Sequence, residues 1–269
     1  MKTILVPTDF SDNAMRALEV AIEIAKKAGS SIVAFNAYDI PYSQNVMTTS
    51  LLEIMKENSE TGMKDIYARL EASGLAFRVE SRLGNPIRAV KELAKKENAD
   101  LVVLGTKGAS GIEEILIGSN AASILHAVDC PVLAIPANGT IDDWKTIVYA
   151  CDLNNNGEQA ALSQLKSIAK TFGSTIAVVH VQDKDDKELH VINRYHYEKY
   201  LDGIELSFHV LEDLGGVEKT ILKFAQEQNA DLLALLARRY GFLQGMFHKS
   251  MTSQIAYHSR LPFLTLHEG

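Results

Sequence analysis

The chain has 269 residues, a length that suits two α/β domains of the commonest size, about 100–150 residues each. Its net charge is −7 and its basic residues are scattered, so we expect no nucleic-acid partner. No apolar run approaches the roughly 20 residues of a membrane span, the N-terminus lacks a cleavable signal pattern, and two cysteines fit a reduced interior. We therefore expect a cytoplasmic protein with no membrane partner.

In the first half, short apolar runs alternate with segments of helical periodicity. Strands are predicted at 4–6, 32–37, 77–81, 101–104 and 132–135. Ser11 is the expected N-cap of the first helix, which Gly29 ends. Further helices are predicted at 51–70, from Pro86 onward, and at 119–126. This alternation predicts a doubly wound sheet of five parallel strands.

Short stretches of the first half return in the second. Lys2-Thr3-Ile4 is echoed by Lys145-Thr146-Ile147, at an offset of 143. Asn98-Ala99-Asp100-Leu101 returns unchanged as Asn229-Ala230-Asp231-Leu232, at an offset of 131. The second half is therefore a diverged copy of the first with a shortened segment in its middle.

The joint between the copies is the turn-rich stretch Ala137-Asn138-Gly139-Thr140. We expect one domain at 1–137 and a second at 141–269, each built on the same α/β plan. In such sheets ligands bind outside the carboxyl ends of the strands. For the first copy these ends are Pro7-Thr8-Asp9, Ala37-Tyr38 and Leu104-Gly105.

A glycine motif follows the fourth strand of the first copy. Gly105 and Gly108 allow sharp turns and close approach to a ligand, and Gly118-Ser119 opens the last helix. The N–H groups and positive dipole end of that helix suit a phosphate. Ser119 can cap the helix or donate its hydroxyl to phosphate. The alternative is that the glycines only make turns and a helix start.

Pro7-Thr8-Asp9 after the first strand and Gly105-x2-Gly108-x9-Gly118-Ser119 after the fourth resemble the ATP-binding class of universal stress proteins. The resemblance implies a strand order of 3-2-1-4-5 and an adenine nucleotide, ATP alone or with Mg²⁺, in the crevice. It assigns the adenine and ribose pocket to Pro7, Thr8, Asp9, Ala37, Leu104 and Gly105, and the phosphates to Gly108, Gly118, Ser119 and Asn120.

Asp9 suits a ribose hydroxyl better than a phosphate, because its carboxylate would repel the triphosphate. The alternative role for Asp9 is to cap the following helix. In the resembled family the edge strands of two domains pair across a two-fold axis. We therefore expect the two sheets of this chain to pack as a pseudo-dimer, and homodimers formed through the same pair of edges remain an open alternative.

The second copy has lost most of the motif. The offset of 131 places Leu236, Arg239 and Lys249 where the first copy has glycines. Asp152 and Ser250 survive at the positions of Asp9 and Ser119. We expect a filled pocket and a structural role, with binding of a different anion by the two cations as the alternative.

Seven of the eight histidines lie in the second copy, and His190 and His196 stand six apart. A zinc site there is an alternative, although no H-x3-H pair on a helix and no cysteine pair supports it. We expect scattered surface or pocket histidines and no metal site.

Three functions remain open at this point. The favoured one is a stress-response protein that binds ATP in its first domain as a regulatory nucleotide-binding module. The second is a slow ATPase or nucleotide-dependent transferase, but no catalytic base is evident, since Glu113 and Glu114 between the glycines are more typical of solvated loops. The third is a scaffold whose second domain holds another ligand or metal.

Overall fold

The computed structural model describes residues 1–39, 49–106, 118–137, 144–151, 158–182, 192–237 and 261–267. The chain divides into two compact units, Met1–Ala137 and Asn138–Gly269. Within the described ranges, no helix combines the length and the apolar character that crossing a membrane requires.

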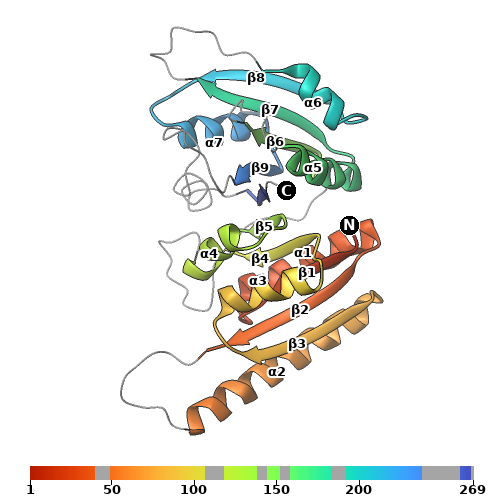
Figure 1. Ribbon diagram of the computed structural model, residues 1–269, viewed down its shortest axis with the longest axis vertical. Coiled ribbons are helices and arrows are strands. Elements are labelled where there is room, and N and C mark those ends of the chain that lie inside the picture. The colour runs from red at the N-terminus through yellow and green to blue at the C-terminus, as the bar shows by residue number, and fades with distance from the viewer. Residues whose placement is uncertain are drawn as a thin grey trace. The chain divides into compact units, whose positions relative to one another are not determined.

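The first unit is the five-stranded parallel sheet that the sequence pattern predicts, with the strand order β3-β2-β1-β4-β5 that the family resemblance implies (Figure 1). Its elements are β1 (Thr3–Pro7), α1 (Asp12–Ala28), β2 (Ser31–Tyr38), α2 (Thr49–Ser73), β3 (Phe77–Leu83), α3 (Pro86–Lys96), β4 (Leu101–Gly105), α4 (Ser119–Ala127) and β5 (Val132–Ile135). The strands β1, β4 and β5 lie in the core, because their central residues are buried.

The second unit repeats this order as β8-β7-β6-β9-β10, again with parallel pairing (Figure 1). Its elements are β6 (Thr146–Ala150), α5 (Glu158–Phe172), β7 (Thr175–Gln182), α6 (Arg194–Tyr200), β8 (Leu206–Glu212), α7 (Val217–Glu227), β9 (Leu232–Ala237) and β10 (Phe263–His267). Helix α6 has 7 residues where α2 has 25, which places the shortening of the second copy in this region.

The strand registers match the sequence repeat residue by residue. Ile4 of β1 lies opposite Leu101 of β4, and Ile147 of β6 lies opposite Leu232 of β9. The offsets between these pairs are 143 and 131, the two values that the repeated stretches give. Positions in the two units can therefore be compared through these registers.

The repeated Asn-Ala-Asp-Leu stretch joins the amino ends of two strands in each unit. Asp100 accepts the backbone N–H groups of Lys2 and Thr3 at 2.6 and 2.9 Å. Asp231 accepts the two N–H groups at the start of β6 at 2.8 and 2.9 Å. The asparagine two residues earlier is left-handed in both units, with φ of 47° and 49°, a conformation that asparagine tolerates better than most residues. The stretch recurs because in both sheets its aspartate links the starts of two neighbouring strands through these hydrogen bonds.

The helix ends of the first unit follow the predicted signals. Ser11 is the N-cap of α1, where its hydroxyl accepts the N–H of Ala14 at 3.2 Å, and Gly29 ends the helix with φ of 66°. Asn85 caps α3 in the same way, with Pro86 in the first turn. These caps fix where α1 and α3 begin, next to the carboxyl ends of the strands.

Candidate functional site

A cavity of about 330 Å³ opens at the carboxyl ends of β1, β2 and β4 in the first unit. This volume is at the lower end of the range for ligand pockets, roughly 300–1,000 Å³. Every residue that the sequence assigns to the nucleotide site lines it except Gly108, which lies outside the described residues. The lining residues are Pro7, Thr8, Asp9, Ala14, Phe35, Ala37, Pro86, Val90, Leu104, Gly105, Gly118, Ser119, Asn120, Ala121 and Ile124.

The turn after β1 is ordered by its own polar side chains. The Thr8 hydroxyl accepts the N–H of Phe10 at 3.0 Å, and Thr8 donates its own N–H to the carbonyl of Phe35 at 2.8 Å. Asp9 Oδ1 accepts the hydroxyl and the N–H of Ser11 at 2.6 and 3.1 Å. The N-cap of α1 is therefore Ser11 and not Asp9, and Asp9 steadies the cap while it also lines the cavity.

The two parts of the glycine motif, Gly105 at the end of β4 and Gly118-Ser119 at the start of α4, both line the cavity. The chain leaves β4 at Thr106, whose N–H donates to the carbonyl of Ile135 at 2.9 Å. The carbonyl of Thr106 accepts the N–H of Gly118 at 2.6 Å, so the residues before and after the intervening segment are held side by side. The crevice that the sequence predicts between these parts is therefore present.

Helix α4 presents its amino end to the cavity. Its first internal hydrogen bond runs from the N–H of Ala122 to the carbonyl of Gly118 at 3.0 Å. The N–H groups of Ser119, Asn120 and Ala121 precede that bond and have no acceptor within the helix. Gly118 is the N-cap, so the alternative that Ser119 caps this helix is wrong, and Ser119 is its first residue.

Gly105 is required by packing between α1 and β4. A Cβ atom at this position would lie 2.7 Å from the backbone oxygen of Asn13 and 2.9 Å from its Cγ. The Asn13 side chain also donates to the carbonyl of Ile135 at 3.0 Å, so this part of α1 is fixed. The interpretation that Gly105 serves only the approach of a ligand is thus incomplete, because the space that it leaves open is filled by α1.

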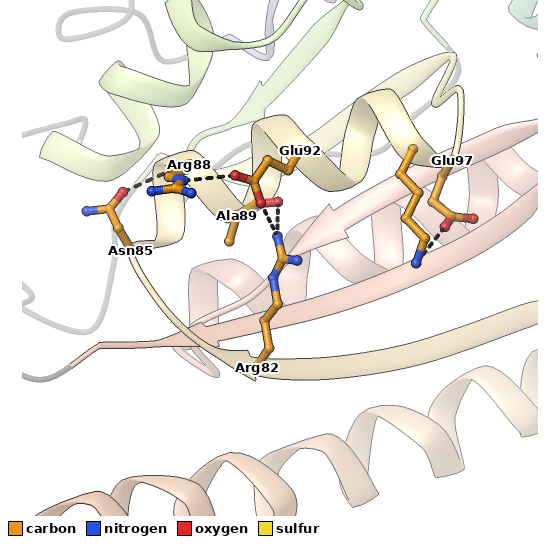
Figure 2. A network of polar contacts seen from close by, with 7 residues as sticks. Arg82, Asn85, Arg88, Ala89, Glu92 and Glu97 are labelled. Carbon is orange, nitrogen blue, oxygen red and sulfur yellow. Dashed lines mark hydrogen bonds and ion pairs between the residues drawn. The ribbon is translucent and has the colours of Figure 1, made fainter.

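Helix α3 forms a further wall of the cavity with Pro86 and Val90, and a surface network holds it to β3 (Figure 2). Arg82 of β3 donates to the carbonyl of Ala89 at 3.0 Å and to Glu92 at 3.2 Å. Arg88 donates to the same carboxylate at 2.8 Å, and this hydrogen bond lowers the pKa of Glu92. The network aligns α3 but is too exposed to contribute much stability.

The cavity lining combines one acidic side chain, one helix amino terminus and apolar surface. Asp9 is the only charged residue among those that line it in the described part of the chain. The amino terminus of α4, which also lines the cavity, carries a partial positive charge. Phe35, Val90 and Ile124 add apolar surface to the lining. This arrangement suits a ligand with an anionic end, a flat apolar body and hydroxyl groups.

Several wall residues are absent from the sequence-based site: Ala14, Phe35, Pro86, Val90, Ala121 and Ile124. Apolar periodicity marks Val90 as core-facing, and Pro86 is identified only as a helix start. Nothing in the spacing distinguishes a residue that faces a cavity from one that faces the core. Phe35 could have been inferred from its position two residues before Ala37, since alternate residues of a strand share a face.

The second unit holds different groups at the equivalent positions. Cys151 donates its N–H to the carbonyl of Val179 at 2.8 Å, as Thr8 does to Phe35 in the first unit. Leu236 of β9, which pairs with Leu266 of β10 as Gly105 of β4 pairs with Ile135 of β5, is buried. A leucine there requires the space that the backbone of α1 takes in the first unit, so the two units pack this helix differently.

A buried carboxylate stands where the first unit has Ala14. The glycines that end α1 and α5 are Gly29 and Gly173, and counting back from them places Glu158 at the position of Ala14. Glu158 is 1% exposed. It accepts the hydroxyl of Tyr149 at 2.5 Å and that of Tyr197 at 3.3 Å. A wall residue of the cavity has thus become part of a polar cluster.

Burial determines the protonation of this cluster. It raises the pKa of Tyr149 and of Tyr197 well above the ordinary value, so both phenols stay neutral and donate to the carboxylate of Glu158. It lowers the pKa of His196, whose Nε2 lies 3.3 Å from Glu158. The cluster is held by hydrogen bonds from two neutral phenols to one buried carboxyl group.

The other residues that the sequence singles out in the second copy, Asp152, Arg239, Lys249, Ser250 and His190, lie outside the described residues, as do Glu113 and Glu114. In the ranges that the structure describes, no three His, Cys, Asp or Glu side chains come together as metal ligands would.

The fold and the cavity define a doubly wound α/β protein of tandem domains, with a ligand-sized cavity at the switch point of the first sheet. The family model described as "Universal stress protein family" matches residues 1–136 and 185–267. The chain therefore belongs to the universal stress protein family.

Relatives match one unit or the whole chain. Universal stress protein MJ0531 of Methanocaldococcus jannaschii is 34% identical over 138 residues, which are 50% of this chain and 81% of that protein. Universal stress protein Sll1388 of Synechocystis is 30% identical over 49% of this chain and 96% of its own length. The crystal structure of a universal stress protein from Archaeoglobus fulgidus covers 99% of this chain and 98% of its own, with a TM-score of 0.79 at 23% identity, and so shares the tandem fold.

Proposed function

We propose that the first unit binds ATP and that the chain is a regulatory nucleotide-binding module of the stress response. The observation that carries this proposal is the hydrogen bond between Gly118 and Thr106, which brings the amino end of α4 to the same cavity as the turn after β1. Three N–H groups without intrahelical acceptors then belong to residues that line a space of about 330 Å³, whose lining also includes the carboxylate of Asp9.

The polarity of the cavity gives the proposed ligand one orientation. The triphosphate would accept hydrogen bonds from the N–H groups of Ser119, Asn120 and Ala121, with Gly108 and Gly118 closing over it. The ribose would donate a hydroxyl to Asp9, far from the phosphates. The adenine would lie in the part of the pocket lined by Pro7, Thr8, Ala37, Leu104 and Gly105. The reverse orientation places like charges together at Asp9.

Magnesium would reach this site with the nucleotide. Mg²⁺ in nucleotide sites is usually held by one or two carboxylates, the phosphates and several waters. Asp9 is the only carboxylate among the described lining residues, and it stands at the proposed ribose end. We therefore propose that the phosphates carry the metal and that ATP also binds without it. The same placement leaves no described carboxylate beside the phosphates to act as a catalytic base, which favours a regulatory module over an ATPase.

The test is a calorimetric titration of the Gly118→Val variant with ATP. A β-branched side chain at the N-cap of α4 would enter the proposed phosphate space, and affinity should fall at least tenfold, about 1.4 kcal/mol. The matched control is Lys249→Val, at the equivalent position of the second copy, where affinity should not change. Unchanged affinity in a folded Gly118→Val variant would remove the basis of the assignment.

A further inference from the structure

We propose that helix α2 sets the affinity of the first unit for its nucleotide, although none of its described residues lines the cavity. It would act through the turn from Thr8 to Ser11, to which it is joined by one apolar and one polar contact. The inference rests on the proposed function, since it concerns the regulation of that same site.

The apolar contact is between Phe10 and Gly62. Phe10 has φ of 64°, a left-handed conformation that costs a residue with a side chain free energy. Its ring lies on the backbone of α2 at Gly62, where an added Cβ would be only 2.5 to 2.7 Å from the ring atoms Cδ1, Cε1 and Cγ. Phe10 stands between Asp9 and Ser11 in the chain. The position of the ring on α2 therefore decides where Asp9 lies in the cavity wall.

The polar contact is a chain of two buried hydrogen bonds. The hydroxyl of Ser59 on α2 donates to Asn36 Oδ1 at 2.6 Å, and Asn36 Nδ2 donates to the carbonyl of Thr8 at 2.7 Å. The three residues are 2%, 5% and 8% exposed. A carbonyl only accepts, so the amide of Asn36 must present its nitrogen to Thr8 and its oxygen to Ser59. Moving Ser59 would leave a buried amide oxygen without its donor.

The helix is fixed to the sheet strongly enough to transmit a shift. Met63, Ile66 and Leu70 are buried along one side of α2, and Tyr67 packs edge-on against Phe77 of β3 at 5.1 Å between ring centroids. Residues on the other side of the helix are exposed, among them Ile54, at 53%. An event on the exposed side would thus reach the Thr8–Ser11 turn through a rigid element.

Coupling between two sites is reciprocal. If the position of α2 changes nucleotide affinity by some factor, the nucleotide changes the equilibrium of α2 by the same factor. Helix α2 is then the element through which occupancy of the cavity is reported to the surface. The second unit retains part of this connection, with His180 Nδ1 lying 3.1 Å from the carbonyl of Cys151, at the place of Asn36 and Thr8.

The test is a double-mutant cycle on the full chain with Gly62→Ala and Phe10→Ala. Alanine suits a helix better than glycine, so α2 itself should not be weakened by Gly62→Ala. Its methyl group should displace the Phe10 ring, weaken ATP binding by about tenfold, and speed amide hydrogen exchange at residues 8–11 in the nucleotide-free protein. In the Phe10→Ala background the same change should alter neither quantity. Thr61→Ala, on the exposed neighbour, is the matched control.

A second pair of variants tests the polar contact. Asn36→Leu should weaken ATP binding about tenfold, whereas Asn36→His, which supplies the ring that the second unit uses, should bind within about threefold of the wild-type chain. A merely structural role would lower thermal stability in both variants without separating their affinities.

The outcomes distinguish the two proposals. If the wild-type chain does not bind ATP, the proposed function fails, while hydrogen exchange at residues 8–11 still decides whether α2 controls the turn. If the wild-type chain binds ATP and Gly62→Ala leaves both affinity and exchange unchanged, the role of α2 is overturned and the proposed function stands.

Discussion

The two units differ at one end of the sheet and agree at the other. At the amino ends of the strands, Asp100 and Asp231 accept the same pair of N–H groups at nearly the same distances. At the carboxyl ends the equivalent residues differ. The position of Gly105 is taken by Leu236 in the second unit, and that of Ala14 by Glu158. The amino end maintains the fold and the carboxyl end carries the site, so a site can be lost without loss of the fold.

The comparison also shows that the second unit differs from the cavity of the first by more than the loss of the glycines. In the first unit the wall at Ala14 is small and apolar. In the second, Glu158 brings a larger, buried carboxyl group to which two tyrosines donate. A triphosphate would meet this group as well as the side chain of Leu236. The hydrogen bonds also make the cluster costly to open, since removing one donor leaves a buried carboxylate short of a partner.

The largest loss of stability is expected from substitutions in β5 and β10, the strands that form one edge of each sheet. We predict that these edges pair and that the units form a pseudo-dimer. Leu133→Lys in β5 or Leu264→Lys in β10 should then cost more than about 4 kcal/mol of stability, because each places a charge in an apolar environment. Leu83→Lys, at a position that is 50% exposed, is the control.

Solution scattering of the wild-type chain decides this prediction. A compact chain of 269 residues should have a radius of gyration of about 18 Å. Two separated domains that tumble independently would give a distinctly larger value and would rule out the pseudo-dimer.

The next largest loss of stability is expected at Gly105 and Leu236, which occupy equivalent positions in the two units. Leu236→Ala should destabilise the chain by about 2–5 kcal/mol, because it removes a buried side chain. Gly105→Ala should cost about 1–3 kcal/mol by overpacking against Asn13, and should weaken ATP binding as α1 shifts. Chemical denaturation and calorimetry measure the two quantities. ATP binding created by Leu236→Ala alone would contradict the view that Glu158 also closes the second site.

A smaller effect is expected from Tyr149→Phe. Loss of its hydrogen bond to Glu158 should cost about 2 kcal/mol at neutral pH. The folded-state pKa of Tyr149 is raised above its unfolded value of 10.0, so its contribution is fully present below pH 10 and is lost as the pH rises further. The difference between wild type and variant should therefore shrink by about 1.4 kcal/mol per pH unit above 10.

Urea denaturation at several pH values measures this difference. A wild-type advantage at Tyr149 that stays constant up to pH 11 would show that the phenol is not held neutral by burial.

The pattern of apolar runs predicts five parallel strands and their carboxyl ends, and the family resemblance implies the strand order and most of the cavity wall. Apolar runs mark the strands, and the ends of β1 and β4 carry Pro7, Asp9 and Gly105 in a recognisable pattern. The repeat supplied the alignment that the registers confirm.

What the sequence does not predict depends on contacts between distant residues. The ring of the left-handed Phe10 packs against α2 at Gly62, a contact that no local pattern marks. The tie from Ser59 through Asn36 to Thr8 joins three elements, and no spacing rule connects them. Glu158 reads as an ordinary first-turn acid of a helix, and only the register of the repeat shows that it replaces Ala14.

The central claim, that one unit binds a nucleotide and the other does not, is tested most directly by native mass spectrometry of the nucleotide-stripped chain titrated with ATP. We predict saturation at one ATP per chain, binding of that ATP at least tenfold weaker in Gly118→Val, and unchanged binding in Lys249→Val. A second ATP bound with comparable affinity, or an ATP that survives Gly118→Val and disappears in Lys249→Val, would contradict the account.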